Sequence, residues 1–240
     1  MKEKLYTIPV TEAFQSDCDC PLCAIHDKLD KEATDYMMGP SYMEGDIRME
    51  TNKVGFCKEH YDKMYHMQNR LGLALMCDTH IQEIIKQLEA GSASLKEGKK
   101  SFFSKGSKEK PELLSFLANI SDNCYICNKI KGNFDRYIDT IFYLWEKEPS
   151  FRELVNKSKG FCFEHFTLLL DKGKENLSKE SYADLVDAVV PKELEVLKAL
   201  EKDVAWFIDK NDYRHKDAPW GTAKDSVERA VKLLSALKVE

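Results

Sequence analysis

Hydrophobic residues recur along the chain with the spacing of α-helices. Between residues 130 and 145, apolar side chains fall at positions that share one face of a helix. The members of this stripe are Ile130, Phe134, Tyr137, Ile138, Ile141 and Trp145. A similar stripe, with one histidine in it, consists of Leu73, Met76, His80, Ile84 and Leu88. Alternating strand patterns are nearly absent, so the sequence predicts an all-α fold.

Two local signals mark helix boundaries in the last third of the chain. An apolar stripe ends before Pro191 and resumes after it, so we expect a new helix or a kink at the proline. The segment TAKD, residues 222–225, resembles a capping box with Asp in the place of Glu or Gln. This segment predicts the start of the last helix, after a loop that precedes it in the sequence.

Composition narrows the class of protein. A chain of 240 residues is long enough for one large domain or two modest ones. The formal charge of −5 gives no global positive field for nucleic acid, and no apolar run is long enough for a membrane span. The N-terminal segment lacks the apolar core of a secretory signal, so we expect a cytoplasmic protein whose eight cysteines stay reduced.

Six of the cysteines belong to a pattern that occurs twice. Each occurrence has a Cys-x-x-Cys pair and, 33 or 34 residues later, a Cys-x-x-His pair. The first frame is Cys20, Cys23, Cys57 and His60, within CPLC and GFCKEH. The second frame is Cys124, Cys127, Cys162 and His165, within CYIC and GFCFEH. The matched spacing indicates an internal duplication.

Three thiolates and one imidazole are the ligand set of a tetrahedral structural zinc site. A Cys-x-x-Cys turn directs two sulfurs at one ion, and a helix that begins with Cys-x-x-His supplies the other two ligands from one face. Gly55 and Gly160 should break the chain before that helix, and Phe56 and Phe161 should exclude water. We therefore expect each frame to close on its own zinc ion, two per chain.

Other ligands and other chemistries stay open at this point. Cys77 and His80 also have Cys-x-x-His spacing, but His80 falls on an apolar stripe, which favours a core residue. Cys18 precedes Cys20 but has no counterpart in the second frame, so we interpret it as a non-ligand. The CPLC segment resembles the redox pair of glutaredoxin-like proteins, although the βαβ context of that pair is missing. Iron is an alternative ion, and the spacing favours zinc.

The frames predict how the chain is divided. The expected parts are a first zinc-binding helical repeat at 1–90, a flexible linker at 91–111, a second zinc-binding repeat at 112–210, and a C-terminal loop and helix at 211–240. The linker is serine-rich and carries a net charge of +4 from six lysines and two glutamates. Phe102 and Phe103 could stack on nucleic acid there, but the acidic remainder of the chain argues against that function.

The order CPLC, GFCKEH and LGLALMCD resembles an uncharacterised family of prokaryotic proteins, classed as a domain of unknown function. The closing segments FIDKNDYRHKDAPW and DSVERA are similar to the C-terminal signature of that family. The resemblance spares the linker, and the second frame departs from it, with Tyr125 in the place of proline and no segment like LGLAL. It implies a helical zinc-binding protein and brings no activity with it.

No nucleotide-binding loop or catalytic motif is found, which favours a protein that is not an enzyme. The C-terminal loop gathers Tyr213, Arg214 and Trp220, which could grip a ligand or partner or could serve packing. We expect a structural-zinc module that binds a protein partner or a second copy of itself, and neither a membrane nor nucleic acid. The alternative is a thiol-based redox or metal-responsive switch that uses the Cys-x-x-Cys pairs.

Overall fold

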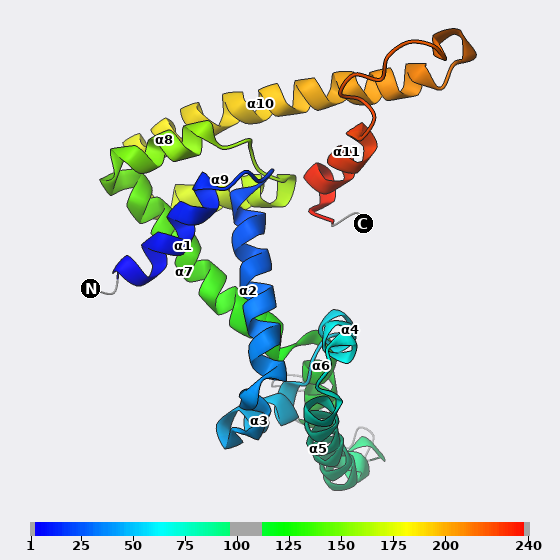
Figure 1. The fold of residues 1–240 in the computed structure, drawn as a ribbon. Coiled ribbons are helices and arrows are strands. Elements are labelled where there is room, and N and C mark those ends of the chain that lie inside the picture. The colour runs from blue at the N-terminus through cyan, green and yellow to red at the C-terminus, as the bar shows by residue number, and fades with distance from the viewer. Residues whose placement is uncertain (1–2, 97–111, 238–240) are drawn as a thin grey trace, which may run out of the picture. The chain divides into compact units, whose positions relative to one another are not determined.

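The computed structural model describes residues 3–96 and 112–237, and helices account for most of them (Figure 1). The prediction of an all-α fold is confirmed, since this part of the chain contains α-helices, two short 3-10 turns and no strand. The α-helices are α1 (Glu3–Gln15), α2 (Pro21–Met38), α3 (Gly45–Val54), α4 (Lys58–His66), α5 (Arg70–Lys96), α6 (Glu112–Asp122), α7 (Tyr125–Lys147), α8 (Pro149–Lys157), α9 (Phe163–Asn176), α10 (Lys179–Lys210) and α11 (Ser226–Ser235). The turns are η1 (Pro40–Met43) and η2 (Tyr213–His215). None of the described helices is both long and apolar enough to cross a membrane.

Three predicted boundaries differ from the observed helices. Residues 91–96 of the expected linker belong to α5, and the rest of that segment, with Phe102 and Phe103, lies outside the described residues. Pro191 lies inside α10, which continues through it, so no new helix starts there, and the alternative of a kink at the proline stays a prediction. The last helix begins after Asp225 and not after Thr222, whose hydroxyl donates a hydrogen bond to the Asp203 carboxylate.

Spatial contacts divide the chain into two compact units. Unit 1 consists of Met1–Lys28 and Asn133–Glu240, and unit 2 consists of Leu29–Gly132. The boundaries fall within α2 and α7, so each of these helices contributes to both units. The units therefore do not coincide with the two sequence frames.

Unit 1 has an aromatic core. Helix α1 packs against α8, and α10 packs against α8, α9 and α11. Phe14 of α1 meets Phe151 of α8 edge to face, with 4.9 Å between ring centroids, and meets Phe161 at 6.3 Å. Trp145 of α7 is buried, and its indole N–H donates to a backbone carbonyl at the start of α10. These contacts hold the N-terminal helix against the segment that leads to Cys162.

Unit 2 is built around α5, which packs against α3, α4 and α6. Its core is rich in methionine and leucine, with Met37, Met38, Met64, Leu73, Met76 and Leu113 buried. Arg48 ties α3 to α5, because its guanidinium donates to the carbonyl of Leu75 and the hydroxyl of Thr79, each at 2.7 Å. Helix α6 lies close to α5 at Gly91, where a Cβ would stand 2.8 Å from the Cβ of Leu113. This packing fixes the segment that runs into Cys124.

Candidate metal centres

Every predicted ligand pair lies at the N-terminus of a helix. Cys20 and Cys124 directly precede α2 and α7, and Cys57 and Cys162 are the N-cap residues of α4 and α9. The second member of each pair lies in the first turn that follows. A helix N-terminus carries partial positive charge and unpaired N–H groups, so it favours a thiolate over a thiol. Pro21 suits the first position of α2, where its missing N–H costs no helical hydrogen bond.

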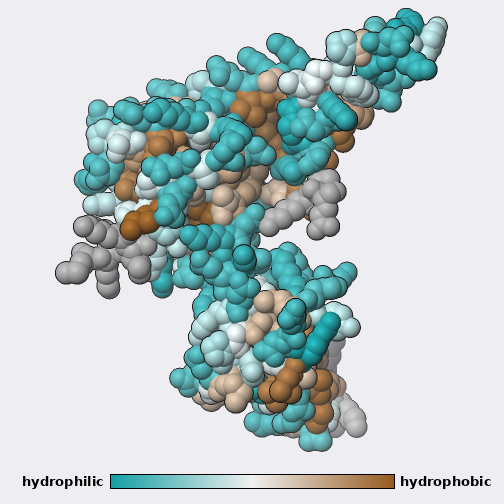
Figure 2. Space-filling view, viewed as in Figure 1, coloured by the Kyte–Doolittle hydropathy of each residue, from teal (hydrophilic) through white to brown (hydrophobic). Residues whose placement is uncertain are grey.

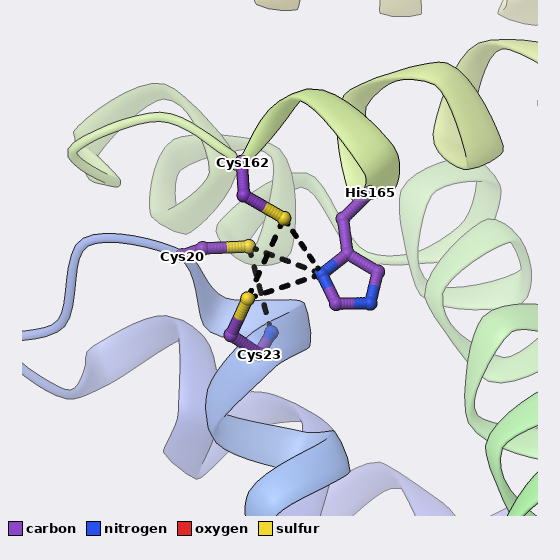
Figure 3. A group of neighbouring side chains, drawn as sticks. All are labelled: Cys20, Cys23, Cys162 and His165. Carbon is purple, nitrogen blue, oxygen red and sulfur yellow. Dashed lines mark hydrogen bonds between the residues drawn. The ribbon is translucent and has the colours of Figure 1, made fainter. Parts of the chain in front are cut away.

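The structure gathers the eight predicted residues into two groups. Site 1 contains Cys20, Cys23, Cys162 and His165 (Figure 3). Site 2 contains Cys57, His60, Cys124 and Cys127. In each group the ligand atoms all lie within 4.8 Å of one another. The expectation that each frame closes on its own ion is wrong, because the Cys-x-x-Cys pair of one frame meets the Cys-x-x-His pair of the other.

Helix packing explains why the groups cross the frames. In unit 1, α1 packs on α8, so the Cys-x-x-Cys pair that follows α1 meets the Cys-x-x-His pair that follows α8. In unit 2, α6 packs on α3 and α5, which brings the pair after α6 to the pair after α3. The amide of Tyr125 donates to the carbonyl of Gly55 at 3.0 Å and joins the two arms of site 2 directly. Each complete group lies within one compact unit.

The spacing of the ligand atoms fits a tetrahedral zinc ion. In site 1 the sulfurs of Cys23 and Cys162 are 3.5 Å apart, and Nδ1 of His165 lies 3.1–3.6 Å from the three sulfurs. In site 2 the sulfurs of Cys57 and Cys127 are 3.8 Å apart, and Nδ1 of His60 lies 3.1–3.4 Å from the sulfurs. Bonds of about 2.3 Å to sulfur and 2.1 Å to nitrogen place neighbouring tetrahedral ligands roughly 3.6–3.8 Å apart. Both donor sets are therefore nearly pre-arranged for zinc.

A carboxylate supports the histidine of site 2. Nε2 of His60 lies 2.8 Å from Oδ1 of Asp30, and the ammonium of Lys63 donates to Oδ2 of the same carboxylate, also at 2.8 Å. Although burial opposes ionisation, Lys63 and His60 hold the pKa of Asp30 below its usual value. A carboxylate on Nε2 fixes the tautomer that leaves Nδ1 free for a metal, and it increases the basicity of the ring.

The pKa values of the site 2 thiols shift in opposite directions, because ionisation of one thiol disfavours ionisation of its neighbour. Burial would raise the pKa of Cys124, but hydrogen bonds from His60 and from backbone amides lower it to about 6. Burial and the neighbouring Cys124 raise the pKa of Cys127. Burial would lower the pKa of His60, but its contacts with Cys124 and Asp30 raise it to about 9. A divalent cation among these groups favours the ionised form of every sulfur and neutral imidazole, which is the charge state of a metal site.

An aromatic ring takes the place of the carboxylate at site 1. Phe134 lies ten residues after Cys124, as Asp30 lies ten residues after Cys20, and its ring packs on His165 at 5.5 Å. The amide of Cys23 donates to the sulfur of Cys20 at 3.5 Å, which is the hydrogen bond expected within a Cys-x-x-Cys turn. Contacts with the site 1 sulfurs outweigh burial and raise the pKa of His165 to about 10. The two sites thus share a ligand set and differ in what holds the imidazole.

The glycines before the Cys-x-x-His pairs have positive φ, 64° at Gly55 and 127° at Gly160. A Cβ on Gly55 would stand 2.6 Å from Nε2 of His80, and one on Gly160 would stand 3.3 Å from Oε2 of Glu193. That same carboxylate oxygen accepts a 3.2 Å hydrogen bond from the amide of Phe161. At these two positions the backbone lies so close to side chains of α5 and α10 that a residue with a Cβ would crowd them. The phenylalanines that follow both glycines are buried, as the sequence predicts.

Cys18, Cys77 and His80 lie outside both groups of ligands. Nδ1 of His80 lies 2.7 Å from the carbonyl oxygen of Asn52, which ties α5 to α3 within unit 2. Cys18 is half-buried, and its sulfur lies 3.2 Å from the hydroxyl of Ser16. These positions agree with the interpretation of all three as residues that do not bind metal.

Two of the three predicted contact residues in the C-terminal loop, Arg214 and Trp220, contact nearby residues of the same chain. Tyr213 is 85% exposed, and Arg214 pairs with Asp212 at 2.7 Å. Trp220 packs its ring on Phe207 of α10, with 5.6 Å between centroids. A role of Tyr213, Arg214 and Trp220 in binding a ligand or partner stays a prediction.

Comparison with known proteins places the chain without assigning it an activity. No curated protein and no solved structure matches it. A family model matches residues 1–240, the whole of the sequence, in agreement with the resemblance seen in the motifs. The chain therefore belongs to the family of unknown function DUF6062.

Proposed function

We propose that this protein is a zinc-stabilised helical module that binds one zinc ion at each of its two sites and presents helical surface to another protein chain. The observation that carries the proposal is the pair of four-ligand groups, each complete and each pre-arranged for tetrahedral zinc. The two sequence frames, as products of an internal duplication, would then have exchanged their Cys-x-x-Cys arms between the two sites.

The ligand sets support a structural role for the zinc. Three thiolates and one imidazole fill the four positions of the ion, which leaves none open for a water or substrate. The ligands also join segments far apart in the sequence, since Cys23 and Cys162 are separated by 139 residues and Cys57 and Cys127 by 70. Closing such loops restricts the unfolded chain, and binding contributes roughly 10 kcal/mol or more per site to the folded state.

Metal analysis of the freshly purified protein tests the zinc proposal. We expect two zinc ions per chain by inductively coupled plasma mass spectrometry, and a large fall in the melting temperature when a strong chelator removes them. A chain that contains no zinc, or that melts at the same temperature after complete removal, would contradict the proposal. Iron at the same stoichiometry would keep the two sites and change the ion.

An apolar stripe on α5 supports the interaction role. Figure 2 shows hydrophobic residues at the surface over this helix. The residues Ile81, Ile85, Leu88 and Leu95 of α5 are each between 42% and 53% exposed. Their spacing of three, four and seven residues is that of the seam through which helices of the same sequence pair. We therefore propose a second copy of this chain as the partner.

Analytical ultracentrifugation distinguishes this partner from others. The wild-type protein should dimerise, and Ile85→Glu should weaken the dimer at least about tenfold, because it buries a charge in the seam. Ala90→Glu adds the same charge at an exposed position on the opposite side of α5 from the stripe and should leave the dimer intact. Zinc content must be equal in all three proteins. A wild-type monomer at every concentration would rule out self-association through this surface.

We also propose that the protein works in a reducing compartment, the cytoplasm. All eight cysteines are free in the structure, and six of them belong to the two sites, where only a thiolate can bind the ion. A second candidate function, the thiol-based switch, is favoured by one observation, which is that Cys127 of site 2 is exposed.

A further inference from the structure

The two sites differ in how far their sulfurs are open to solvent. Cys127 of site 2 is exposed, whereas the residue at the same position of site 1, Cys23, is half-buried. The N-cap cysteines differ in the same direction, because Cys57 is half-buried and Cys162 is buried. Site 2 is thus the more accessible site at both of the positions that differ. Reactivity of a thiolate toward dissolved reagents follows its exposure.

We propose that Cys127 and Cys57 form a peroxide-reactive pair, whose disulfide opens site 2 while site 1 keeps its ligands. The proposal rests on the function proposed above, since it requires zinc-ligating thiolates at both sites. Under this proposal, Cys127 and Cys57 are sites of reversible oxidation, so site 2 responds to limiting peroxide and site 1 does not.

The reaction needs a hydroperoxide as oxidant and proceeds in two steps. The Cys127 thiolate attacks one peroxide oxygen, the O–O bond breaks, and hydroxide or alkoxide leaves, so that the sulfur becomes a sulfenic acid. The Cys57 thiolate then attacks this sulfur, the S–S bond forms, and the hydroxyl group leaves as hydroxide. The two sulfurs together lose two electrons, and the peroxide gains them. His60 and Cys124 are then the only ligands left at site 2.

Geometry selects Cys57 as the second sulfur. The sulfurs of Cys57 and Cys127 lie 3.8 Å apart, so a modest rotation of the exposed Cys127 side chain brings them toward the roughly 2.05 Å of a disulfide. Cys124 is the competing partner, but its side chain is 2% exposed, and His60 and backbone amides of Cys57 and Cys127 hold its sulfur. Cys57 is half-buried and therefore more accessible than Cys124, so we expect its thiolate to be the one that attacks the oxidised Cys127.

Burial protects the corresponding pair at site 1. Cys23 and Cys162 are 3.5 Å apart, closer than the 3.8 Å of the site 2 pair, so distance alone would let them form a disulfide. However, Cys23, which takes the place of the attacking Cys127, is half-buried. Cys162 is only 4% exposed, and the ring of Phe134 packs on the adjacent imidazole of His165. Because the attacking sulfur must first meet a dissolved peroxide, access distinguishes the two sites and proximity does not.

The experiment is a peroxide titration of the zinc-loaded full chain. The Cys18→Ser/Cys77→Ser variant removes the two cysteines that are not ligands, so every remaining thiol reports on a site. Metal content is measured before any oxidant is added, and two zinc ions per chain establish the starting state. Hydrogen peroxide is then added in limiting amounts, while released zinc is followed with a chromophoric chelator. Samples are alkylated, digested with trypsin and analysed by mass spectrometry.

The expected result is release of one zinc ion, together with a disulfide between the peptide VGFCK, which holds Cys57, and the peptide that ends at Lys129. Fragment ions should place the bond at Cys127. Site 1 should react at least about tenfold more slowly, and a dithiol with added zinc should restore both ions. Release of both ions at one rate, no release, or a disulfide between Cys124 and Cys127 would overturn the proposal. A chain with no zinc at the start would instead overturn the proposed function.

Discussion

Asp30 and His60 form a 2.8 Å hydrogen bond between a carboxylate oxygen and the imidazole nitrogen that faces away from the site 2 sulfurs. At the matching position of the second frame, Phe134 packs its ring on His165. Two sites with the same four ligand types therefore have different surroundings. A carboxylate on the imidazole increases its basicity, whereas a phenyl ring only orients and shields it.

This difference predicts a site-selective effect of Asp30→Ala. Loss of the carboxylate should weaken zinc binding at site 2 by about 10- to 100-fold and leave site 1 unchanged. Competition with a graded series of chelators measures the affinity of each site. Asp35→Ala, at an exposed position of the same helix, is the matched control. Equal weakening of both sites, or of neither, would show that the Asp30 contact does not tune site 2.

A second prediction concerns the turn before Cys57. Gly55→Ala places a Cβ 2.6 Å from Nε2 of His80 on a backbone with a φ of 64°, so we expect the folded state to lose about 2 kcal/mol or more. Thermal unfolding of the zinc-loaded protein measures the loss. Gly55→Ala combined with His80→Ala removes the steric part and should be less destabilised than the two single changes added together. Strict additivity would refute the clash.

A third prediction follows from the buried carboxyl of Glu193. Burial raises its pKa, and repulsion from Cys162 acts in the same direction. Because the folded state holds this proton to higher pH than the unfolded chain does, stability is lost as the pH rises from the unfolded pKa through the folded one. Glu193→Gln, which keeps an acceptor for the Phe161 amide, should therefore raise the melting temperature at a pH of about 8.

The pH dependence distinguishes charge from packing in this variant. The advantage of Glu193→Gln should shrink toward a pH of about 4, near the pKa of a glutamate in an unfolded chain, because the wild-type carboxyl gains its proton as the pH falls to that value. Differential scanning calorimetry of both proteins in the same buffers cancels any acid-induced metal loss that they share. A variant that is less stable than the wild type by the same amount at both pH values would contradict this account of Glu193.

The sequence predicts the helical fold and the eight residues at the two sites, because both signals are local. Apolar stripes repeat with the period of a helix, and each ligand pair occupies one turn. Nothing local records which pairs meet. The two frames have almost the same internal spacing, so closure within a frame and closure across frames fit the sequence equally well. The choice depends on α1 packing against α8 and on α6 packing against α3 and α5.

The sequence also does not predict which residues support the two sites. Asp30 lies 30 residues before His60, and its only signal is its place on an amphipathic helix that begins with a ligand pair. Nothing in the sequence distinguishes Glu193 from the other acidic residues, and only the fold shows that it is buried against the turn before Cys162. The capping signal at Thr222 misplaced the last helix, which begins after Asp225, and the Thr222 hydroxyl instead donates to Asp203 of α10. Long-range contacts determine the roles of Asp30 and Glu193.

The exchange of arms between the two frames is the central claim, and the zinc content of two double variants tests it most directly. Cys23→Ser/Cys162→Ser removes two ligands from site 1, so one zinc ion should survive a competing chelator. Cys23→Ser/Cys57→Ser damages both sites, so no tightly bound zinc should remain. If each frame instead closed on its own ion, the second variant would keep one tightly bound zinc and the first would keep none.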